Sequence, residues 1–330
     1  MPILFVSGIN DLSLVGVTLD ERGQVGYLMD GNCSVHGRLP LRDGVAQPYT
    51  LFGRGVRQQM PAFRVTPSLI FNQIADADTH RGALERCIEL CRSLDCPVVN
   101  PPDRILATTR DQVSAQLQGI PGVTIPRILR FRPDSPEGVL DHAARSDLKF
   151  PFIVRVAGDH QGKRMVRLER PEDVATLHPL PFDGRDFYLV EFVDYRDEDG
   201  LYHKHRVIVV DGEPLLRHAL YFDHWMVHAS SRKFMLERDS WDQDVARFDR
   251  LSRELLPRFR PAIDAITARL GLQYYGMDCK LGEDGRMVIF EANANMNVLH
   301  SPNAASRYRV EAIAQRLHAL LEKYSGERVT

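Results

Sequence analysis

The sequence lacks most features that mark secreted, membrane-spanning or nucleic-acid-binding proteins. Its 330 residues include only 5 cysteines and 2 tryptophans. No stretch reaches the ~20 apolar residues of a membrane helix, and the start, MPILFVSGIN, lacks the basic and long apolar segments of a signal peptide. Lys and Arg number 42 against 44 Asp and Glu, so the formal net charge of −2 gives nucleic acid no electrostatic support as the main partner. These absences predict a cytoplasmic protein without a nucleic-acid or membrane partner.

An odd number of cysteines in a chain of this length argues against a disulfide framework and favours reduced thiols. Cys87, Cys91 and Cys96 lie in or just after a predicted helix over 81–94. A metal or redox site is one interpretation of this trio. Small core residues are the favoured one, because Cys87 and Cys91 stand four residues apart among apolar neighbours. Cys279 follows Asp278 on a predicted strand, so its side chain is expected to face the opposite way, into a core.

Motifs for zinc or for a protein nucleophile are also absent. The sequence contains neither HExxH nor CxxC, and it offers no Ser-His-Asp or Cys-His arrangement. Among its 12 histidines, His203 and His205 alternate along a predicted strand, where substrate contact or surface placement is favoured over zinc. Four residues are candidates for lining a pocket for a second substrate: His218, Tyr221, His224 and Trp225.

A length of 330 residues predicts about two domains, and a hydrophobic content of 44% is enough to form their cores. Four strand-like runs precede a helix over 81–94 and a strand at 97–100, which predicts an N-terminal α/β unit. Pro101 and Pro102 then mark a boundary near residue 102. Beyond it we expect a helix over 104–120 and a strand over 121–131.

The most informative segment is a predicted β-hairpin near the end of the chain. The turn sequence GEDG at 282–285 separates two apolar runs, YYGMDCKL and RMVIFEA, so the two strands should pair antiparallel. Pairing would bring Asp278, Glu291 and Asn293 together, with Asn295 two residues further on. Two carboxylates and an amide oxygen suit Mg²⁺ or Mn²⁺, and an incomplete set of protein ligands suits a metal that also binds phosphates. A solvated hairpin with ordinary turn residues is the alternative.

A second candidate site is the polar loop GDHQGK at 158–163, which is predicted to join two strands. Gly158, Gly162 and Lys163 could lay backbone N–H groups over phosphates, although the loop is not a Walker motif, because it runs into a strand rather than a helix. An exposed hairpin tip is the alternative. Arg155 and Arg206 each stand inside an otherwise apolar strand, so each must pair with an anion or face a cleft.

The order of these parts resembles the ATP-grasp superfamily, which includes glutathione synthetase and the RimK-type carboxylate-amine ligases. The resemblance covers about residues 100 to 300. It rests on four segments in the family's order: VNPPDRI…RDQV…GIPGVTIPRIL, FPFIVRVAGDHQGKRMV, YLVEFVD and MDCKL…IFEANANMN. It implies an α/β (α+β) fold with an N-terminal α/β domain (1–102), an ATP-grasp middle or lid subdomain (103–190) and a C-terminal subdomain with the metal site (191–330). The two α+β subdomains would enclose the nucleotide.

The resemblance also implies roles for single residues, with ATP and Mg²⁺ or Mn²⁺ as cofactors. Asp278, Glu291 and Asn293 would hold the metal, and Arg206 and Arg155 would act in catalysis by facing the transferred phosphate. Glu191 and Val193 would lie at the adenine, and Asp194 or Asp199 at the ribose. The implied nucleotide contacts are Arg110, Arg155, Gly158, Gly162, Lys163, Glu191, Val193, Asp194 and Asp199.

Two departures from the family pattern concern Arg110 and Arg155, which stand where the family has lysines. Arginine keeps the charge but is bulkier and binds phosphate in a different geometry. The implied reaction is ATP-dependent activation of a carboxylate as an acyl phosphate, followed by joining to an amine of an amino acid or peptide. A non-catalytic ATP-binding regulatory module and an ATP-grasp kinase remain as alternatives. The sequence does not specify the oligomeric state, for which a homodimer is the commonest case.

Overall fold

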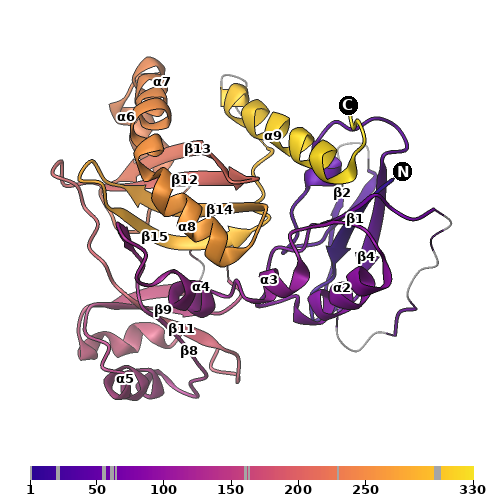
Figure 1. Cartoon of the computed structure of the whole chain (residues 1–330). Coiled ribbons are helices and arrows are strands. Elements are labelled where there is room, and N and C mark those ends of the chain that lie inside the picture. The colour runs from indigo at the N-terminus through magenta and orange to yellow at the C-terminus, as the bar shows by residue number, and fades with distance from the viewer. Residues whose placement is uncertain are drawn as a thin grey trace.

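The computed structural model describes residues 2–19, 23–53, 57–59, 63, 65–159, 162, 164–228, 230–300 and 306–330. Three larger sheets and one separate hairpin form within these ranges. In Figure 1 the sheet that contains β1 and β4 lies to the right, the sheet with β8, β9 and β11 lies at the lower left, and the C-terminal sheet lies above the latter. No helix among the described residues is long and apolar enough to span a membrane.

The N-terminal sheet is parallel, as expected for alternating strands and helices. Its order is β4 (Ala46–Leu51), β1 (Ile3–Gly8), β5 (Leu69–Asn72) and β6 (Val98–Val99). Two helices accompany it, α1 (Val35–Arg38) and α2 (Arg81–Ser93). Strands β2 (Gly16–Leu19) and β3 (Val25–Leu28) pair with each other and with no other strand of the described residues. Helix α2 buries Leu84, Cys87 and Leu90, so Cys87 is a core residue as predicted.

The middle sheet is antiparallel, in the order β10 (Met165–Leu168), β9 (Phe152–Val156), β11 (Phe187–Glu191) and β8 (Ile128–Phe131). Helix α5 (Pro136–Arg145) and the 3-10 turn η1 (Pro171–Leu177) pack with it around a separate apolar cluster. This cluster includes Val139, Phe152 and Phe187, all fully buried. The middle sheet therefore has its own small core.

The C-terminal sheet has the order β13 (Glu213–Phe222), β12 (Tyr202–Val210), β14 (Tyr274–Leu281), β15 (Met287–Ala294) and β7 (Val123–Thr124). Its helices are α6 (Ser231–Arg238), α7 (Trp241–Arg250), α8 (Arg260–Leu270) and α9 (Arg307–Ser325). Between α7 and α8 lie a π turn, η2 (Leu251–Leu255), and a 3-10 turn, η3 (Leu256–Phe259). Pro257 and Pro261 lie in the first turns of η3 and α8, where a proline is tolerated. The predicted hairpin 274–294 is confirmed, and Cys279 is buried on its core side.

Two predicted elements are wrong. The helix expected over 104–120 is two helices, α3 (Pro102–Leu106) and α4 (Arg110–Leu117), because Thr109 has an extended backbone and starts α4 anew. The strand expected over 121–131 is split into β7 and β8, which join different sheets on either side of Pro126. Val113 and Leu117 of α4 accordingly pack in the same apolar cluster as Met277 of the C-terminal sheet.

Candidate functional site

The carboxylates of the predicted metal site lie on adjacent strands of the C-terminal sheet. Asp278 of β14 is opposite Glu291 of β15, and Gly276 is opposite Asn293. The next pair is Cys279 with Ile289, so Phe290 is an extra residue that forms a β-bulge. A bulge changes the face to which the following side chains point, and here it turns Glu291 to the face of Asp278. The strand pairing thus brings the three predicted metal ligands to one face of the sheet.

Asp278 is ion-paired with two cations of the neighbouring strand β12. Arg206 donates from Nε and Nη2 to its two carboxylate oxygens at 2.7 and 2.9 Å, and Lys204 Nζ lies 3.2 Å from Oδ2. Burial alone would raise the pKa of Asp278, but Arg206 and Lys204 together lower it to about 2. The carboxylate is therefore ionised at neutral pH. Lys204 was not predicted as a site residue, although it alternates with Arg206 on a strand and so shares its face.

Glu291 has a cation of its own, supplied by the first turn of α4. It forms an ion pair with Arg110, and both side chains are largely buried. Burial and Asp278 would raise the pKa of Glu291, but Arg110, Arg155 and Lys204 together hold it below the ordinary value. Arg110, predicted as a phosphate contact, is thus ion-paired with Glu291, a predicted metal ligand more than 180 residues away in the sequence.

Arg155 differs from Arg206, Lys204 and Arg110 because it forms no ion pair with a carboxylate among the described residues. Its residue is 8% exposed on β9, its Nη2 donates to the carbonyl of Asp159, and its Nε has no acceptor within the described part of the chain. Burial and the nearby Arg110 lower its pKa to about 10. The fold therefore buries the positive charge of Arg155 without a carboxylate beside it, which is typical of an anion-binding site.

We expect Arg155→Met to leave the free energy of unfolding unchanged or slightly raised, because methionine fills a similar volume without a buried charge. The same change should weaken binding of a non-hydrolysable ATP analogue by about tenfold or more, the usual scale for a lost charge-assisted contact. Urea unfolding and calorimetric titration measure the two effects. Arg132→Met is the matched control, since Arg132 is 65% exposed. A variant that loses stability but keeps its affinity would contradict the assignment.

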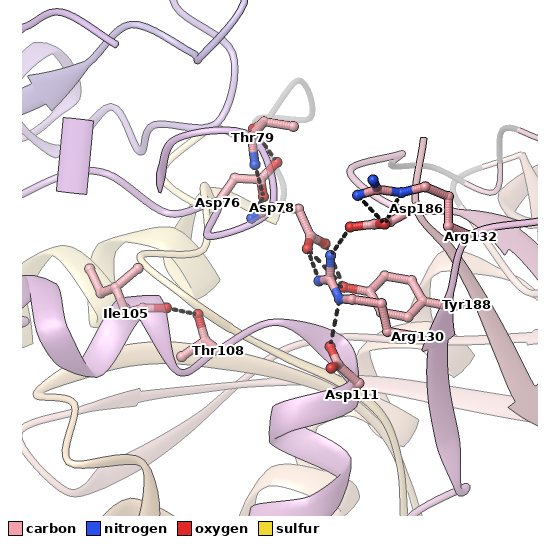
Figure 2. Close-up of polar contacts among 10 residues, drawn as sticks. All are labelled: Asp76, Asp78, Thr79, Ile105, Thr108, Asp111, Arg130, Arg132, Asp186 and Tyr188. Carbon is pink, nitrogen blue, oxygen red and sulfur yellow. Dashed lines mark hydrogen bonds and ion pairs between the residues drawn. The ribbon is translucent and has the colours of Figure 1, made fainter. Parts of the chain in front are cut away.

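A second polar cluster joins the loop after β5 to the middle sheet (Figure 2), and its members Asp78 and Tyr188 lie near Arg110. Arg130 of β8 contacts Asp78 from the loop after β5, Asp186 at 3.0 Å, Asp111 of α4 at 3.4 Å and the hydroxyl of Tyr188. The Tyr188 hydroxyl also donates to Asp78. Burial and Asp78 raise the pKa of Tyr188, so the phenol stays protonated. These contacts hold the loop after β5 against the middle sheet.

The predicted glycine loop begins beside the same N-terminal loop. Gly158 has a φ of +77°, and a Cβ there would come within 2.8 Å of the Thr79 side chain, so only glycine fits. At the other end, Gly162 has a φ of +72° and lies next to Met226. The predicted phosphate contact Lys163, like residues 160–161, lies outside the described residues.

The predicted adenine and ribose contacts lie at the end of β11 and in the segment that follows it. Glu191 Oε2 accepts from the backbone N–H of Arg127 at 3.0 Å, Asp194 pairs with Arg196, and Asp199 lies 2.9 Å from His203 Nε2. Val193, between them, is half-buried.

This segment nevertheless touches the end of the site. The Tyr195 ring packs on Phe290, the bulge residue next to Glu291, with centroids 4.4 Å apart. The neighbouring Phe192 ring lies under the Arg167 guanidinium at 3.7 Å. The segment therefore borders the carboxylate face through its aromatic rings rather than through its acidic side chains.

A further buried cation, not predicted from the sequence, lies at the bulge where β13 pairs with Arg206 and Val207 of β12. Arg217 of β13 is 7% exposed and donates to the carbonyls of Val298 and His300 at 3.1 and 2.8 Å. Burial, together with Arg232 and Arg206, lowers its pKa to about 10. The signal was present in the sequence, because Arg217 interrupts the apolar run LLRHALYF as Arg155 and Arg206 interrupt theirs.

The four residues expected to line a second-substrate pocket do not gather in one place. His218 is opposite Arg206 on the site face, and burial and Arg206 hold its pKa well below the ordinary value. Tyr221 lies on the other face of β13, under Arg247 of α7. His224 and Trp225 follow the strand, with ring centroids 5.4 Å apart. Only His218 shares the face of the carboxylates.

Asn295, expected beside the metal ligands, has a structural role instead. Its Oδ1 accepts from Asn100 at 2.7 Å, and its Nδ2 donates to the carbonyls of Asn72 and Ile74 at 2.9 and 2.8 Å. It is fully buried with a φ of +51°. All its polar atoms are occupied in joining β15 to the N-terminal sheet, so it is not available as a metal ligand.

The donor set fits Mg²⁺ or Mn²⁺ bound together with a polyphosphate. Asp278 and Glu291 have lowered pKa values and are ionised, as metal ligands must be. In the described part of the chain no group of three or more His, Cys, Asp or Glu side chains is placed to hold a metal. Two carboxylates and one amide, each binding through one oxygen, leave about half the positions of an octahedral ion for water and phosphate oxygens.

Three larger sheets with helices packed on them place the chain among the mixed α/β proteins. The structure is similar to the D-Ala:D-Ser ligase VanG from Enterococcus faecalis, with 14% sequence identity, a TM-score of 0.54 and coverage of 98% of this chain and 99% of that one. It is also similar to a RimK domain ATP-grasp protein from Sphaerobacter thermophilus, at 13% identity, a TM-score of 0.48 and coverage of 82% and 89%.

A further similarity is to the ATP-grasp ligase PsnB complexed with precursor peptide PsnA2 and AMPPNP, at 15% identity, a TM-score of 0.46 and coverage of 98% of each chain. No protein-family model and no curated protein sequence matches the chain. The likeness to VanG over nearly the whole chain shows that the protein has the ATP-grasp fold, as its sequence predicted.

Proposed function

We propose that this protein is an ATP- and Mg²⁺-dependent ligase that activates a carboxylate as an acyl phosphate and joins it to an amine of an amino acid or peptide. One observation carries the proposal. Two ionised carboxylates, Asp278 and Glu291, share a face with the cations Lys204, Arg206 and Arg110, and Arg155 lies nearby without a carboxylate partner among the described residues. Such a face suits a polyphosphate bound through a divalent metal.

The side chains of this face have separate tasks in the proposed reaction. Asp278, Glu291 and Asn293 would hold Mg²⁺. The bound metal would neutralise part of the negative charge of the phosphates. Arg155 and Arg110 would bind phosphate oxygens, and Arg206 would face the phosphoryl group that is transferred. No protein nucleophile is needed, because catalysis rests on positioning and charge neutralisation.

The chemistry balances in two steps. An oxygen of the substrate carboxylate attacks the γ-phosphorus of ATP, the bond to the bridging oxygen breaks, and ADP leaves. The amine then attacks the acyl carbon of the acyl phosphate, inorganic phosphate departs with the electrons of the broken C–O bond, and the nitrogen loses one proton. Exclusion of water from the site would limit hydrolysis of the acyl phosphate.

Arg217 is a candidate anchor for an organic substrate. It is buried near Arg206, and its partners in the described part of the chain are neutral carbonyls, so an anion of the substrate would be its first charged partner. Its position on the strand next to Arg206 places this anchor beside the phosphates. A substrate carboxylate bound to Arg217 would lie close to the γ-phosphoryl group that Arg206 would face.

The test is a product analysis of the purified protein with Mg²⁺, ATP and pooled amino acids or short peptides as carboxylate and amine. A ligase releases ADP and phosphate in equal amounts only when both substrates are present, and mass spectrometry finds the condensed product. A stable phosphorylated compound would identify a kinase instead. Nucleotide binding without any turnover across the pools would favour the regulatory module over an enzyme.

A further inference from the structure

Both carboxylates of the candidate metal site are already paired with cations of the protein. Asp278 accepts from Arg206 at 2.7 and 2.9 Å and lies 3.2 Å from Lys204 Nζ, so both of its oxygens are engaged. Glu291 is ion-paired with Arg110, and only 13% of the Arg110 side chain and 21% of the Glu291 side chain are exposed. A divalent metal that binds these carboxylates therefore competes with the cations for them.

The two carboxylates differ in how their cations are held. Arg206 and Lys204 reach Asp278 from β12, which is hydrogen-bonded to β14 with Arg206 directly opposite Asp278. Arg206 also bonds through two nitrogens to two oxygens, the strongest geometry for such a pair. Arg110 reaches Glu291 from outside the sheet, at the start of α4, and its contact joins Nη2 to Oε2. The pair with Glu291 is therefore the one that exchanges partners more readily.

The other carboxylate near Arg110 already has partners. It is Asp78, which is bonded to Arg130 and to the hydroxyl of Tyr188. A metal that took Glu291 from Arg110 would thus leave a buried guanidinium without its counter-ion, and such a loss is strongly unfavourable. A polyphosphate changes this balance, because its oxygens offer Arg110 a new and bidentate partner.

The charge of the whole face favours the same ligand. Lys204, Arg206, Arg110 and Arg155 are four cations set against two carboxylates, so the face has a formal charge of +2. A positive face repels a free divalent cation and attracts phosphate groups. Both the ion pairs and the net charge therefore disfavour a metal that arrives without phosphate.

We infer that Arg110 couples the two ligands of this site. By holding Glu291 it keeps a free divalent metal from binding, and by moving to a phosphate it releases Glu291 to a metal that binds with the polyphosphate. The inference rests on the proposed function, since it takes Asp278 and Glu291 as metal ligands and the cations as phosphate contacts. It adds an order of binding, in which the nucleotide binds before the metal or together with it. Linkage then requires that metal and nucleotide strengthen each other's binding by the same factor.

Binding of Mn²⁺ without nucleotide tests the first half of the inference. Electron paramagnetic resonance measures the free ion as Mn²⁺ is added to the full-length wild type and to Arg110→Met. The variant should bind Mn²⁺ about tenfold or more tightly than the wild type does, because methionine leaves Glu291 unpaired and removes one positive charge. A residue that only supported the structure of the site would have the opposite effect.

Binding of nucleotide without metal tests the second half. In calorimetric titration with a non-hydrolysable ATP analogue in a chelating buffer, Arg110→Met should bind about tenfold or more weakly than the wild type. Arg110→Lys keeps the charge and should stay close to the wild type in both measurements. Arg132→Met is the matched control, since Arg132 is 65% exposed and pairs with Asp186, and it should change neither affinity. Circular dichroism checks that every variant is folded.

The two affinities should therefore shift in opposite directions in Arg110→Met, which a general loss of structure does not produce. The inference would be overturned if this variant bound free Mn²⁺ no more tightly than the wild type, or if its affinity for the metal-free analogue were unchanged. Failure of the proposed function has a different signature. Opposite shifts in binding, without release of ADP and phosphate for any pair of carboxylate and amine, would keep the coupling and refute the ligase.

Discussion

Replacing Glu291 with glutamine should remove the Mg²⁺-dependent part of nucleotide binding. In the folded protein Glu291 is an ionised carboxylate beside Asp278 and is paired with Arg110. Glutamine keeps the shape but not the charge, so the metal loses one of its two anionic ligands while Arg110 is freed to bind phosphate. We expect the gain in affinity for a non-hydrolysable ATP analogue on adding Mg²⁺ to fall by about tenfold or more, a loss of at least about 1.4 kcal/mol.

Calorimetric titration with and without Mg²⁺ measures this gain directly. Glu283→Gln is the matched control, because Glu283 lies in the turn of the same hairpin, is 55% exposed and pairs with Arg250. It should bind as the wild type does. If Glu291→Gln kept the full response to Mg²⁺, the metal would have to bind elsewhere, and if the wild type bound no nucleotide the proposed function would fail.

Replacing Asp278 with asparagine should be the most destabilising change at the site. Asp278 is 3% exposed and is the counter-ion of both Arg206 and Lys204. Asparagine would leave those two cations buried near Arg110 and Arg155 with Glu291 as the remaining carboxylate of the face. Removing one partner of a buried ion pair typically lowers the free energy of unfolding by about 3–5 kcal/mol.

The same variant separates a phosphate site from an ordinary structural ion pair. A nucleoside triphosphate added without Mg²⁺ should stabilise Asp278→Asn more than the wild type, because its phosphates take the place of the missing Asp278 carboxylate. Urea unfolding with and without the nucleotide in a chelating buffer measures both effects. Asp284→Asn, at a 49% exposed turn residue paired with Arg286, should change stability by no more than about 0.5 kcal/mol. Equal stabilisation of wild type and Asp278→Asn would show that the phosphates do not meet Arg206 and Lys204.

Local patterns predicted which residues of the candidate site come together where those residues are close in sequence or on paired strands. The turn at 282–285 and two apolar runs are enough to align Asp278 with Glu291, because a tight turn sets the register of a hairpin. Arg155 and Arg206 stood out for an equally local reason, since a cation inside an apolar strand needs a partner. Arg217 obeys the same rule and could have been predicted in the same way.

Other features have no local signal. Asn295 continues the alternation of Glu291 and Asn293, yet the turn of the backbone after β15 directs it to Asn100 and the N-terminal sheet. The division of residues 104–120 into α3 and α4 and of 121–131 into β7 and β8 likewise reflects which sheets the pieces join. The packing of these segments against different sheets decides their boundaries and orientation, because tertiary contacts override local propensity.

By itself, the sequence determined the type of fold, the hairpin with its two carboxylates and the buried cations of the candidate site, because turns, periodicity and charge in apolar runs are local properties. Tertiary structure alone decided that Arg110 pairs with Glu291, that Lys204 joins Arg206 on Asp278, and that Arg155 is left without a carboxylate among the described residues. Those pairings depend on distances between segments far apart in the chain. Only the packing of α4 and the three sheets sets those distances.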